Sequence, residues 1–311
     1  MPRPVILGVC GDSAAGKTTI TKGLVELLGR DIVTHVAGDD YHRYDRKQRA
    51  ERAITPLNPE CNYMDVMEYH FGLLKAGKSI LKPVYQHGDG TFGPPEYVTP
   101  QQFTVVEGLL GYHTPALRAV YDVRVYLAPP EELRRKWKVD RDCSKRGYTT
   151  DQVLDELDRR EPDSAAFIRP QQQRADIVVA FQPGDRADDN HLDARVTLRA
   201  GLNHPDLAPF TDGKDVELTD EKDDGEFTLV VSGSTSPEHV AEIEEAIWSQ
   251  MHFARHLRTE KLGEFTFGAK QVERSASLAI VQLLILYHLL TARASVALGA
   301  EGSRADQEVT A

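Results

Sequence analysis

Two short stretches concentrate side chains that could bind phosphates and move protons. The first, GDSAAGKT, consists of Gly11, Asp12, Ser13, Ala14, Ala15, Gly16, Lys17 and Thr18, and Thr19 follows it. The second, GDDYHRYDR at residues 38–46, contains two adjacent carboxylates, a histidine, two arginines and two tyrosines. A solvated turn could hold either set by chance, so the surrounding sequence has to decide whether they form a site.

The first stretch has the pattern of a phosphate-binding loop: Gly, any four residues, Gly, Lys, and then Ser or Thr. It follows an apolar run at 5–9 and precedes a helical pattern at 18–28, whereas an ordinary glycine turn needs neither. Gly11 and Gly16 allow backbone N–H groups to converge on phosphates, and Lys17 can reach the β- and γ-phosphate oxygens. Because Thr18 can hold Mg²⁺ through its hydroxyl, we expect ATP and Mg²⁺ to bind here.

Acidic side chains follow two further apolar runs. Asp39 and Asp40 come after the run at 32–37, and Glu107 ends the run at 103–107. In an open parallel sheet, residues at the carboxyl ends of the strands converge. We therefore expect Asp39 to be the general base of phosphoryl transfer and Glu107 to hold Mg²⁺, although Glu107 alone could equally be a helix cap or a solvated turn. Asp40 is not assigned the same role, because adjacent side chains cannot both aim at one hydroxyl.

A strongly basic helical pattern at 130–147 lies further along the chain. A lid that closes over ATP needs arginines to stabilise charge on the transferring group, and Arg141 and Arg146 are our candidates. The alternative is a solvated helix face, because Lys138, Asp142 and Arg146 are spaced four residues apart and can pair with each other.

The elements that must position these residues are arranged as an α/β fold. Residues 1–183 alternate short β-branched runs with longer helical patterns, which is typical of a parallel sheet wound with crossover helices. Five strands are expected, at 5–9, 32–37, 103–107, 123–127 and 176–181. Residues 184–298 contain alternating strand patterns and two helices, at 237–253 and 275–297. They predict a smaller mixed strand and helix C-terminal extension that serves assembly, and the polar tail at 299–311 is predicted to be disordered.

Composition limits the partners. Lys and Arg number 37 against 48 Asp and Glu, and the net charge of −11 argues against broad attraction to nucleic acid or to an anionic membrane. The 3 cysteines are far apart and no leader precedes the first strand, so we expect a cytoplasmic protein. The apolar run at 275–292 could span a bilayer by length. Gln282 and His288 would lack partners in hydrocarbon, so we expect a helix buried in a core or subunit interface instead.

Five motifs together point to a family. The chain resembles the phosphoribulokinase family, within the wider phosphoribulokinase and uridine kinase group. The motifs that carry the resemblance occur in this order: GDSAAGKT, GDDYHRYDR, PVYQHGDG, VVEGLLG and RDCSKRGYT. The resemblance covers about residues 4–180 and implies a P-loop NTPase-type kinase domain. It further implies transfer of the ATP γ-phosphate to O1 of ribulose 5-phosphate, a reaction of the Calvin cycle, and a homo-oligomeric protein.

The resemblance also implies roles for individual residues. Asp39 matches the catalytic base, assisted by Lys17. His42 and Arg46 match the contacts to the sugar phosphate. Tyr85 and His87 are implied to close the acceptor pocket, although this loop could instead pack its aromatic side chain against the core. Asp142 matches a second carboxylate near the metal and nucleotide.

Two departures from the family pattern stand out. Leu110 occupies a position where members commonly carry histidine, with His113 nearby. Plant-type members carry regulatory cysteines where this chain has alanine and glycine, at 14–15 and 37–38, so a redox switch of that kind is not expected.

Three other functions remain open at this point: a uridine kinase-like nucleoside kinase, a kinase of another pentose phosphate, and a non-catalytic nucleotide-binding regulator. A phosphorylated acceptor needs a second anion site, which uridine does not. The cations available to build that site are His42, Arg43, Arg46, Arg49 and Arg52.

Overall fold

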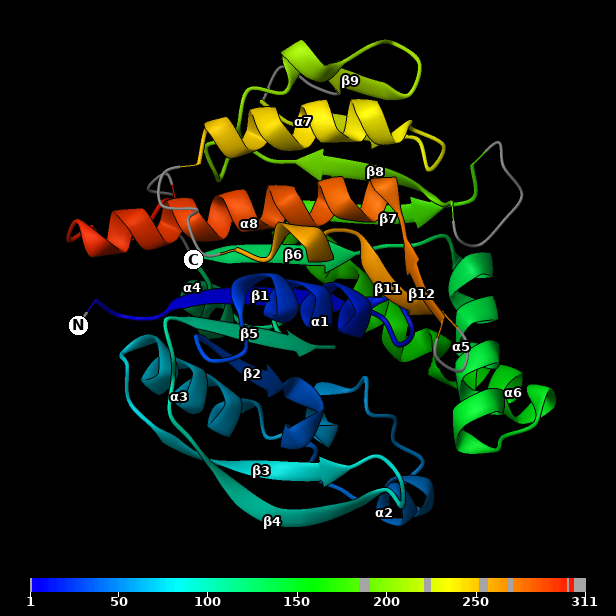
Figure 1. Ribbon diagram of the computed structural model, residues 1–311. Coiled ribbons are helices and arrows are strands. Elements are labelled where there is room, and N and C mark those ends of the chain that lie inside the picture. Colours follow the sequence, from blue (N-terminus) through cyan, green and yellow to red (C-terminus); the bar gives the residue numbers. More distant parts are fainter. Residues whose placement is uncertain are drawn as a thin grey trace.

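The computed structural model describes residues 2–184, 191–220, 225–251, 257–267, 271–300 and 302–304. One large sheet lies at its centre (Figure 1). Its strands are β1 (Val5–Gly11), β2 (Val33–Ala37), β5 (Phe103–Gly108), β6 (Val123–Leu127), β7 (Ile177–Gln182), β8 (Asp193–Leu198), β9 (Val216–Asp220) and β10 (Phe227–Val231). Their order is β2-β5-β1-β6-β7-β8-β10-β9. The first five in this order pair in parallel, and β8, β10 and β9 continue the sheet by antiparallel pairing.

Helices cover both faces of the sheet, as the apolar parallel strands require. The cluster on one face includes α1 (Lys17–Leu28), α7 (Pro237–Ser249) and α8 (Ala276–Ala297), and the cluster on the other includes α3 (Met64–Lys75) and α4 (Pro115–Val120). Because side chains alternate along a strand, β1 contributes Val5, Leu7 and Val9 to the first cluster and Ile6 and Cys10 to the second.

The remaining elements frame the edge to which the parallel strands point (Figure 1). The helices α5 (Glu131–Arg146) and α6 (Thr150–Asp163) form a hairpin there, and α2 (Arg46–Glu51) follows the GDDYHRYDR stretch. A separate two-stranded sheet is formed by β3 (Ile80–Gln86) and β4 (Thr91–Val98). A second small ribbon, β11 (Glu264–Phe267) with β12 (Gln271–Arg274), precedes α8.

The predicted α/β fold with a mixed C-terminal extension is confirmed. The strands β8, β9 and β10 of the extension belong to the central sheet, because β8 pairs directly with β7. The β3–β4 hairpin, β9 and the β11–β12 ribbon were not predicted. Residues 252 and 253 of the predicted helix at 237–253 lie outside the described residues, as do residues 301 and 305–311 of the predicted tail.

The long apolar helix α8 is buried in the core, as expected. Among the described residues it is the one helix long and apolar enough for a membrane span, and 72% of its most apolar window is buried inside the protein. Two of its buried polar side chains have partners: Gln282 Oε1 accepts from the Gly263 N–H at 2.8 Å, and His288 Nε2 lies 3.0 Å from His204 Nδ1. The Gln282 Nε2 atom is buried without a hydrogen-bond partner among the described residues. These contacts explain how a helix of this composition carries an amide and an imidazole in its buried part.

Candidate functional site

The phosphate loop joins β1 to α1, and its backbone needs residues without a bulky side chain. Gly16 has a φ of 94°, and a Cβ on Gly11 would lie 2.6 Å from the carbonyl oxygen of Leu127. Ala14 also has a positive φ, 67°, a conformation that residues with a Cβ adopt at an energetic cost and mostly in functional loops. The loop therefore brings the N-terminus of α1 to the carboxyl edge of the sheet, where Thr18 and Thr19 lie in its first turn.

Lys17 lies folded against its own loop. Its Nζ donates to the carbonyl oxygens of Gly11 and Asp12, both at 2.8 Å. Burial lowers the pKa of Lys17, and the carboxylates of Asp39 and Glu107 oppose that shift by favouring the ammonium form. The lysine is thus electrostatically linked to both carboxylates that the strand-end argument selected.

Glu107 is oriented by three donors at the end of β5. Its Oε2 accepts from Thr21 Oγ1 at 2.9 Å, and its Oε1 lies 3.4 Å from both Thr18 Oγ1 and His35 Nε2. Burial tends to raise the pKa of Glu107, but the contacts with His35, Lys17 and Thr21 lower it on balance, so the side chain is a carboxylate. Sequence reasoning missed His35 and Thr21, although His35 lies on the same strand face as Ala37, the residue paired with Glu107.

Asp39 lies in a short 3₁₀ helix, Gly38–Tyr41, directly after β2. Its Oδ2 is 3.6 Å from His87 Nε2. Burial tends to raise the pKa of Asp39, but His42, His87 and Lys17 lower it on balance, which keeps it ionised. Asp39 and Glu107 also line the same hollow, so the two acids lie close together as the rule for strand ends predicts.

Asp40 points elsewhere and supports the neighbouring hairpin. Its Oδ2 accepts from Lys82 Nζ at 2.5 Å, and its Oδ1 accepts from the Tyr85 N–H at 2.8 Å. Both members of the ion pair are buried, with the Lys82 side chain 6% exposed. Asp40 thereby fixes β3 beside the GDDYHRYDR stretch, a function that the sequence did not reveal.

The residues predicted to hold the acceptor are brought together by that hairpin. His42 Nδ1 bonds Asn62 Oδ1 at 2.8 Å, and its ring packs edge-on against Tyr85, with 4.9 Å between centroids. Tyr85 packs in the same way against His87, at 5.0 Å. Arg46 donates to the carbonyl oxygen of His87 at 2.7 Å. Burial lowers the pKa of His42, so the imidazole contributes hydrogen bonding more than charge at neutral pH.

Arg49, one of the cations near Arg46, lies deeper than Arg46. It is buried, donates to the carbonyl oxygen of Tyr44 at 2.8 Å and to the Tyr85 hydroxyl at 2.5 Å, and stacks over the Tyr85 ring. Among the described residues, the Arg49 guanidinium forms no ion pair with a carboxylate. A buried guanidinium of this kind is available to an anionic ligand.

The helix α5 carries the predicted lid residues in an ion-pair cluster around Asp142. Asp142 Oδ1 accepts from Arg141 Nε at 2.8 Å and lies 3.4 Å from Arg146, and its Oδ2 accepts from Lys138 at 2.8 Å. Burial tends to raise the pKa of Asp142, yet Arg141 and Lys138 hold it at about 2. Among the described residues, no hydrogen bond or ion pair of Asp142 reaches Thr18 or Glu107. Its predicted place in the metal site therefore stays a prediction.

Leu110, which departs from the family pattern, is buried, and the nearby His113 is half-buried. Leu110 packs with Leu57, Leu109 and Ile168, and His113 lies against Phe167. Cys10 and Cys61 are both fully buried free thiols. Burial raises the pKa of Cys10 to about 12, which leaves its thiol unreactive at neutral pH.

The sequence profile of the Phosphoribulokinase / Uridine kinase family matches residues 6–187, more than half of the chain. The chain belongs to this family. A phosphoribulokinase from Synechocystis sp. is 39% identical over 205 residues, which are 65% of this chain and 62% of that protein. A chloroplastic phosphoribulokinase from Triticum aestivum is 32% identical over 221 residues, covering 64% of this chain and 55% of that protein.

This phosphoribulokinase/uridine kinase family member is also similar to nucleoside kinases and to a solved structure. A uridine kinase from Shewanella amazonensis is 31% identical over 200 residues, covering 62% of this chain and 94% of that protein. The structure of phosphoribulokinase from Rhodobacter spheroides shares the fold, with a TM-score of 0.59 and 20% identity over 80% of this chain and 97% of that chain. The chain spans 62% and 55% of the two phosphoribulokinase sequences above.

Proposed function

We propose that this chain is a phosphoribulokinase, which transfers the γ-phosphoryl group of ATP to O1 of D-ribulose 5-phosphate and yields ribulose 1,5-bisphosphate and ADP. The observation that carries the proposal is the position of Asp39. Its Oδ2 lies 3.6 Å from His87 Nε2 of the acceptor pocket, and Lys17 of the phosphate loop helps to lower its pKa, together with His42 and His87. A base placed between a nucleotide site and a sugar site is what phosphoryl transfer to an alcohol requires.

In the proposed reaction, Asp39 accepts the proton of the O1 hydroxyl as the oxygen forms its bond to the γ-phosphorus. The bond between that phosphorus and the β,γ-bridging oxygen breaks, and ADP leaves with the bond's electron pair. The lowered pKa of Asp39 keeps the carboxylate ready to accept a proton at neutral pH. Lys17 neutralises charge on the β- and γ-phosphate oxygens, and we assign Arg141 and Arg146 to the transferring group once α5 closes.

The residues present fit Mg²⁺. Glu107 is ionised, and its Oε1 lies 3.4 Å from the Thr18 hydroxyl. Together the carboxylate and the hydroxyl would supply two of the hard oxygen ligands that this ion prefers. Mg²⁺ usually keeps several waters and takes its other ligands from substrate phosphates, so a larger protein cage is not needed. When bound, the ion neutralises charge on the β- and γ-phosphates. The described residues contain no cluster of three or more His, Cys, Asp or Glu side chains that could hold a metal without a nucleotide.

The acceptor's own phosphate is assigned to the cationic side of the pocket. The cations available there are Arg46 and the buried Arg49, and His42 adds a hydrogen-bonding imidazole. Tyr85 with His87 forms the wall next to Asp39. Hydrogen bonds between such cations and a phosphate contribute about 1.5–3 kcal/mol each. This cationic capacity favours a sugar phosphate over a nucleoside.

A uridine kinase is the second candidate, because the chain covers 94% of the Shewanella amazonensis enzyme that bears this name. The two candidates differ in whether the acceptor carries a phosphate. For the setting of the reaction, we propose the cytoplasm and a homo-oligomeric state, with the extension at 184–298 contributing to assembly.

Identification of the product tests the proposal. The purified protein is incubated with ATP, Mg²⁺ and ribulose 5-phosphate, and ³¹P NMR should detect a second sugar phosphomonoester that grows in step with ADP. The Asp39→Asn variant, run in parallel, should form it at least a hundredfold more slowly if Asp39 is the base. ATP consumption without a new sugar phosphate, or consumption only with uridine, would overturn the proposal.

A further inference from the structure

We infer that Asp12 and Ser164 are positioning residues, which couple nucleotide binding in the phosphate loop to the placement of the α5–α6 hairpin that carries Arg141 and Arg146. The inference rests on the proposed function only in that ATP binds the loop. It is independent of which acceptor is phosphorylated.

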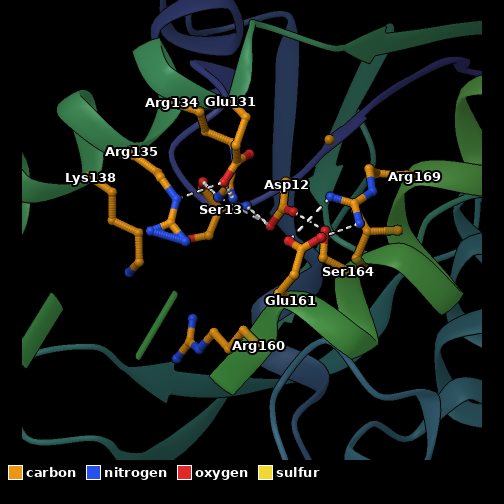
Figure 2. Close-up of polar contacts among 12 residues, drawn as sticks. Asp12, Ser13, Glu131, Arg134, Arg135, Lys138, Arg160, Glu161, Ser164 and Arg169 are labelled. Atoms are coloured by element: carbon orange, nitrogen blue, oxygen red, sulfur yellow. Dashed lines mark hydrogen bonds and ion pairs between the residues drawn. The ribbon is translucent and has the colours of Figure 1, made fainter. Parts of the chain in front are cut away.

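The Asp12 side chain lies between Arg134 of α5 and Ser164, which directly follows α6 (Figure 2). It is buried, with 7% of its surface exposed, and it joins three parts of the chain. Its Oδ1 accepts from the Ser13 N–H at 2.6 Å, and its Oδ2 accepts a short hydrogen bond from Ser164 Oγ. Because a buried carboxylate is costly without partners, this arrangement holds only while loop and hairpin stay together.

Arg134 of α5 makes the second connection to the loop. Its Nη1 donates to the Ser13 carbonyl oxygen at 2.9 Å and lies 3.6 Å from Asp12 Oδ1. Glu131 holds the same guanidinium through two bonds, at 2.7 and 2.8 Å. Figure 2 shows Arg134 and Glu131 on one side of Asp12, and Glu161 with Arg169 on the other. The helix α5 is therefore tied to Ser13 and Asp12, and the turn that directly follows α6 is tied to Asp12.

The backbone around Ser164 has a conformation suited to a hinge. Ser164–Ile168 is a π-helical turn that follows α6 directly, and Pro162 lies inside α6. Insertions of this kind change the direction of a helix and are frequent at functional sites. Asp12, Arg134, Arg160 and Ser164 line one narrow depression, where the hairpin meets the loop.

The loop can transmit nucleotide binding because Asp12 is engaged at both its backbone and its side chain. Its carbonyl oxygen accepts from Lys17 Nζ, while its carboxylate holds Ser164. The β- and γ-phosphates compete with that carbonyl for Lys17, so binding releases the Asp12 peptide on one side of a residue whose other side fixes the hairpin. A ligand in the loop thus binds with a different free energy when the hairpin is placed differently. Coupling between the two sites requires such a difference.

Hydrogen–deuterium exchange with Ser164→Ala tests this coupling directly. In the wild-type protein, a non-hydrolysable ATP analogue with Mg²⁺ should change exchange both in the loop at 11–18 and in the hairpin at 131–163. In Ser164→Ala the change in the loop should persist, while the change in the hairpin should shrink by about three- to tenfold, the effect of losing one buried hydrogen bond. Ser164→Thr, which retains the hydroxyl, should restore it.

Ser144→Ala is the matched control. Ser144 lies on α5, but its hydroxyl donates to the Asp140 carbonyl of its own helix, so its removal should leave the hairpin response intact. Exchange in α8 reports whether each variant keeps its fold. A hairpin response that is equal in wild type and Ser164→Ala, or equally reduced by Ser164→Ala and Ser144→Ala, would overturn the inference.

Discussion

At the scale of single residues, two neighbouring aspartates have different environments and should fail in different ways when changed. Asp39 lines the hollow with Glu107, whereas Asp40 is paired with the buried Lys82. Both aspartates follow the same predicted strand. The sequence distinguishes them only because adjacent side chains cannot both aim at one hydroxyl.

Asp39→Asn should lower kcat by roughly 10²- to 10⁴-fold, because it removes a general base while keeping the shape of the side chain. Nucleotide affinity, measured by calorimetry, and the melting temperature should stay close to wild type. Turnover near the wild-type rate would remove Asp39 from this role.

Asp40→Asn should instead destabilise the protein by about 3 kcal/mol, because it leaves the Lys82 ammonium buried without its principal counter-charge. Denaturant unfolding measures this loss, and Asp39→Asn is the control. If Asp40→Asn keeps full stability, then Glu96, 3.6 Å from Lys82, is the partner that matters.

At the scale of elements, one carboxylate orders the cations in the C-terminal half of α5. Asp142 is almost fully buried and holds Lys138, Arg141 and Arg146 together. This arrangement assigns Asp142 a structural function in the conformation described, next to its predicted place near the metal.

Asp142→Asn should therefore lower the free energy of unfolding by an amount that depends on pH. The folded-state pKa of about 2 is below the ordinary value of 3.8, so the carboxylate's contribution is fully present above pH 4 and is lost as pH falls toward 2. The shift corresponds to on the order of 2 kcal/mol. The free energies of unfolding of wild type and variant, measured in urea, should differ at pH 7 and converge toward pH 2. A difference that stays constant with pH would contradict this structural function. A changed Mg²⁺ requirement of the variant would support the predicted place of Asp142 near the metal.

At the scale of the whole molecule, the kinase sheet and the C-terminal extension are one packing unit. The strand β8 covers the edge of β7, and α8 packs against α1, β1, β8 and β10. Removing the extension would expose an apolar sheet face and an unpaired strand edge.

Residues 1–183 alone should consequently fail to fold as a soluble monomer. Near-ultraviolet circular dichroism and size-exclusion chromatography compare this fragment with residues 1–304, which keep every described helix and strand and should retain the native signal. A monomeric fragment with a cooperative melting transition would show that the kinase segment is an independent domain.

Features that depend on a local motif were predictable from the sequence, whereas features that depend on contacts between distant residues were not. The phosphate loop and the positions of Asp39 and Glu107 were predictable, because they depend on a local motif and on the rule that strand ends converge. The β3–β4 hairpin was not, because Pro83, Pro94 and Pro95 are poor strand residues and the buried ion pair with Asp40 supplies the missing support. The contacts of Asp142 and Ser164 depend on how α5 and α6 fold back, which no local pattern encodes.

The acceptor preference of the purified protein tests the central claim most directly. Initial rates with ATP and Mg²⁺ are measured for ribulose 5-phosphate, ribulose and uridine at the same enzyme concentration. We predict that kcat/KM for ribulose 5-phosphate exceeds that for ribulose by at least about tenfold, the contribution of one charge-assisted hydrogen bond to the remote phosphate, and that uridine reacts more slowly still. Uridine turning over as well as ribulose 5-phosphate would contradict the account and identify a nucleoside kinase.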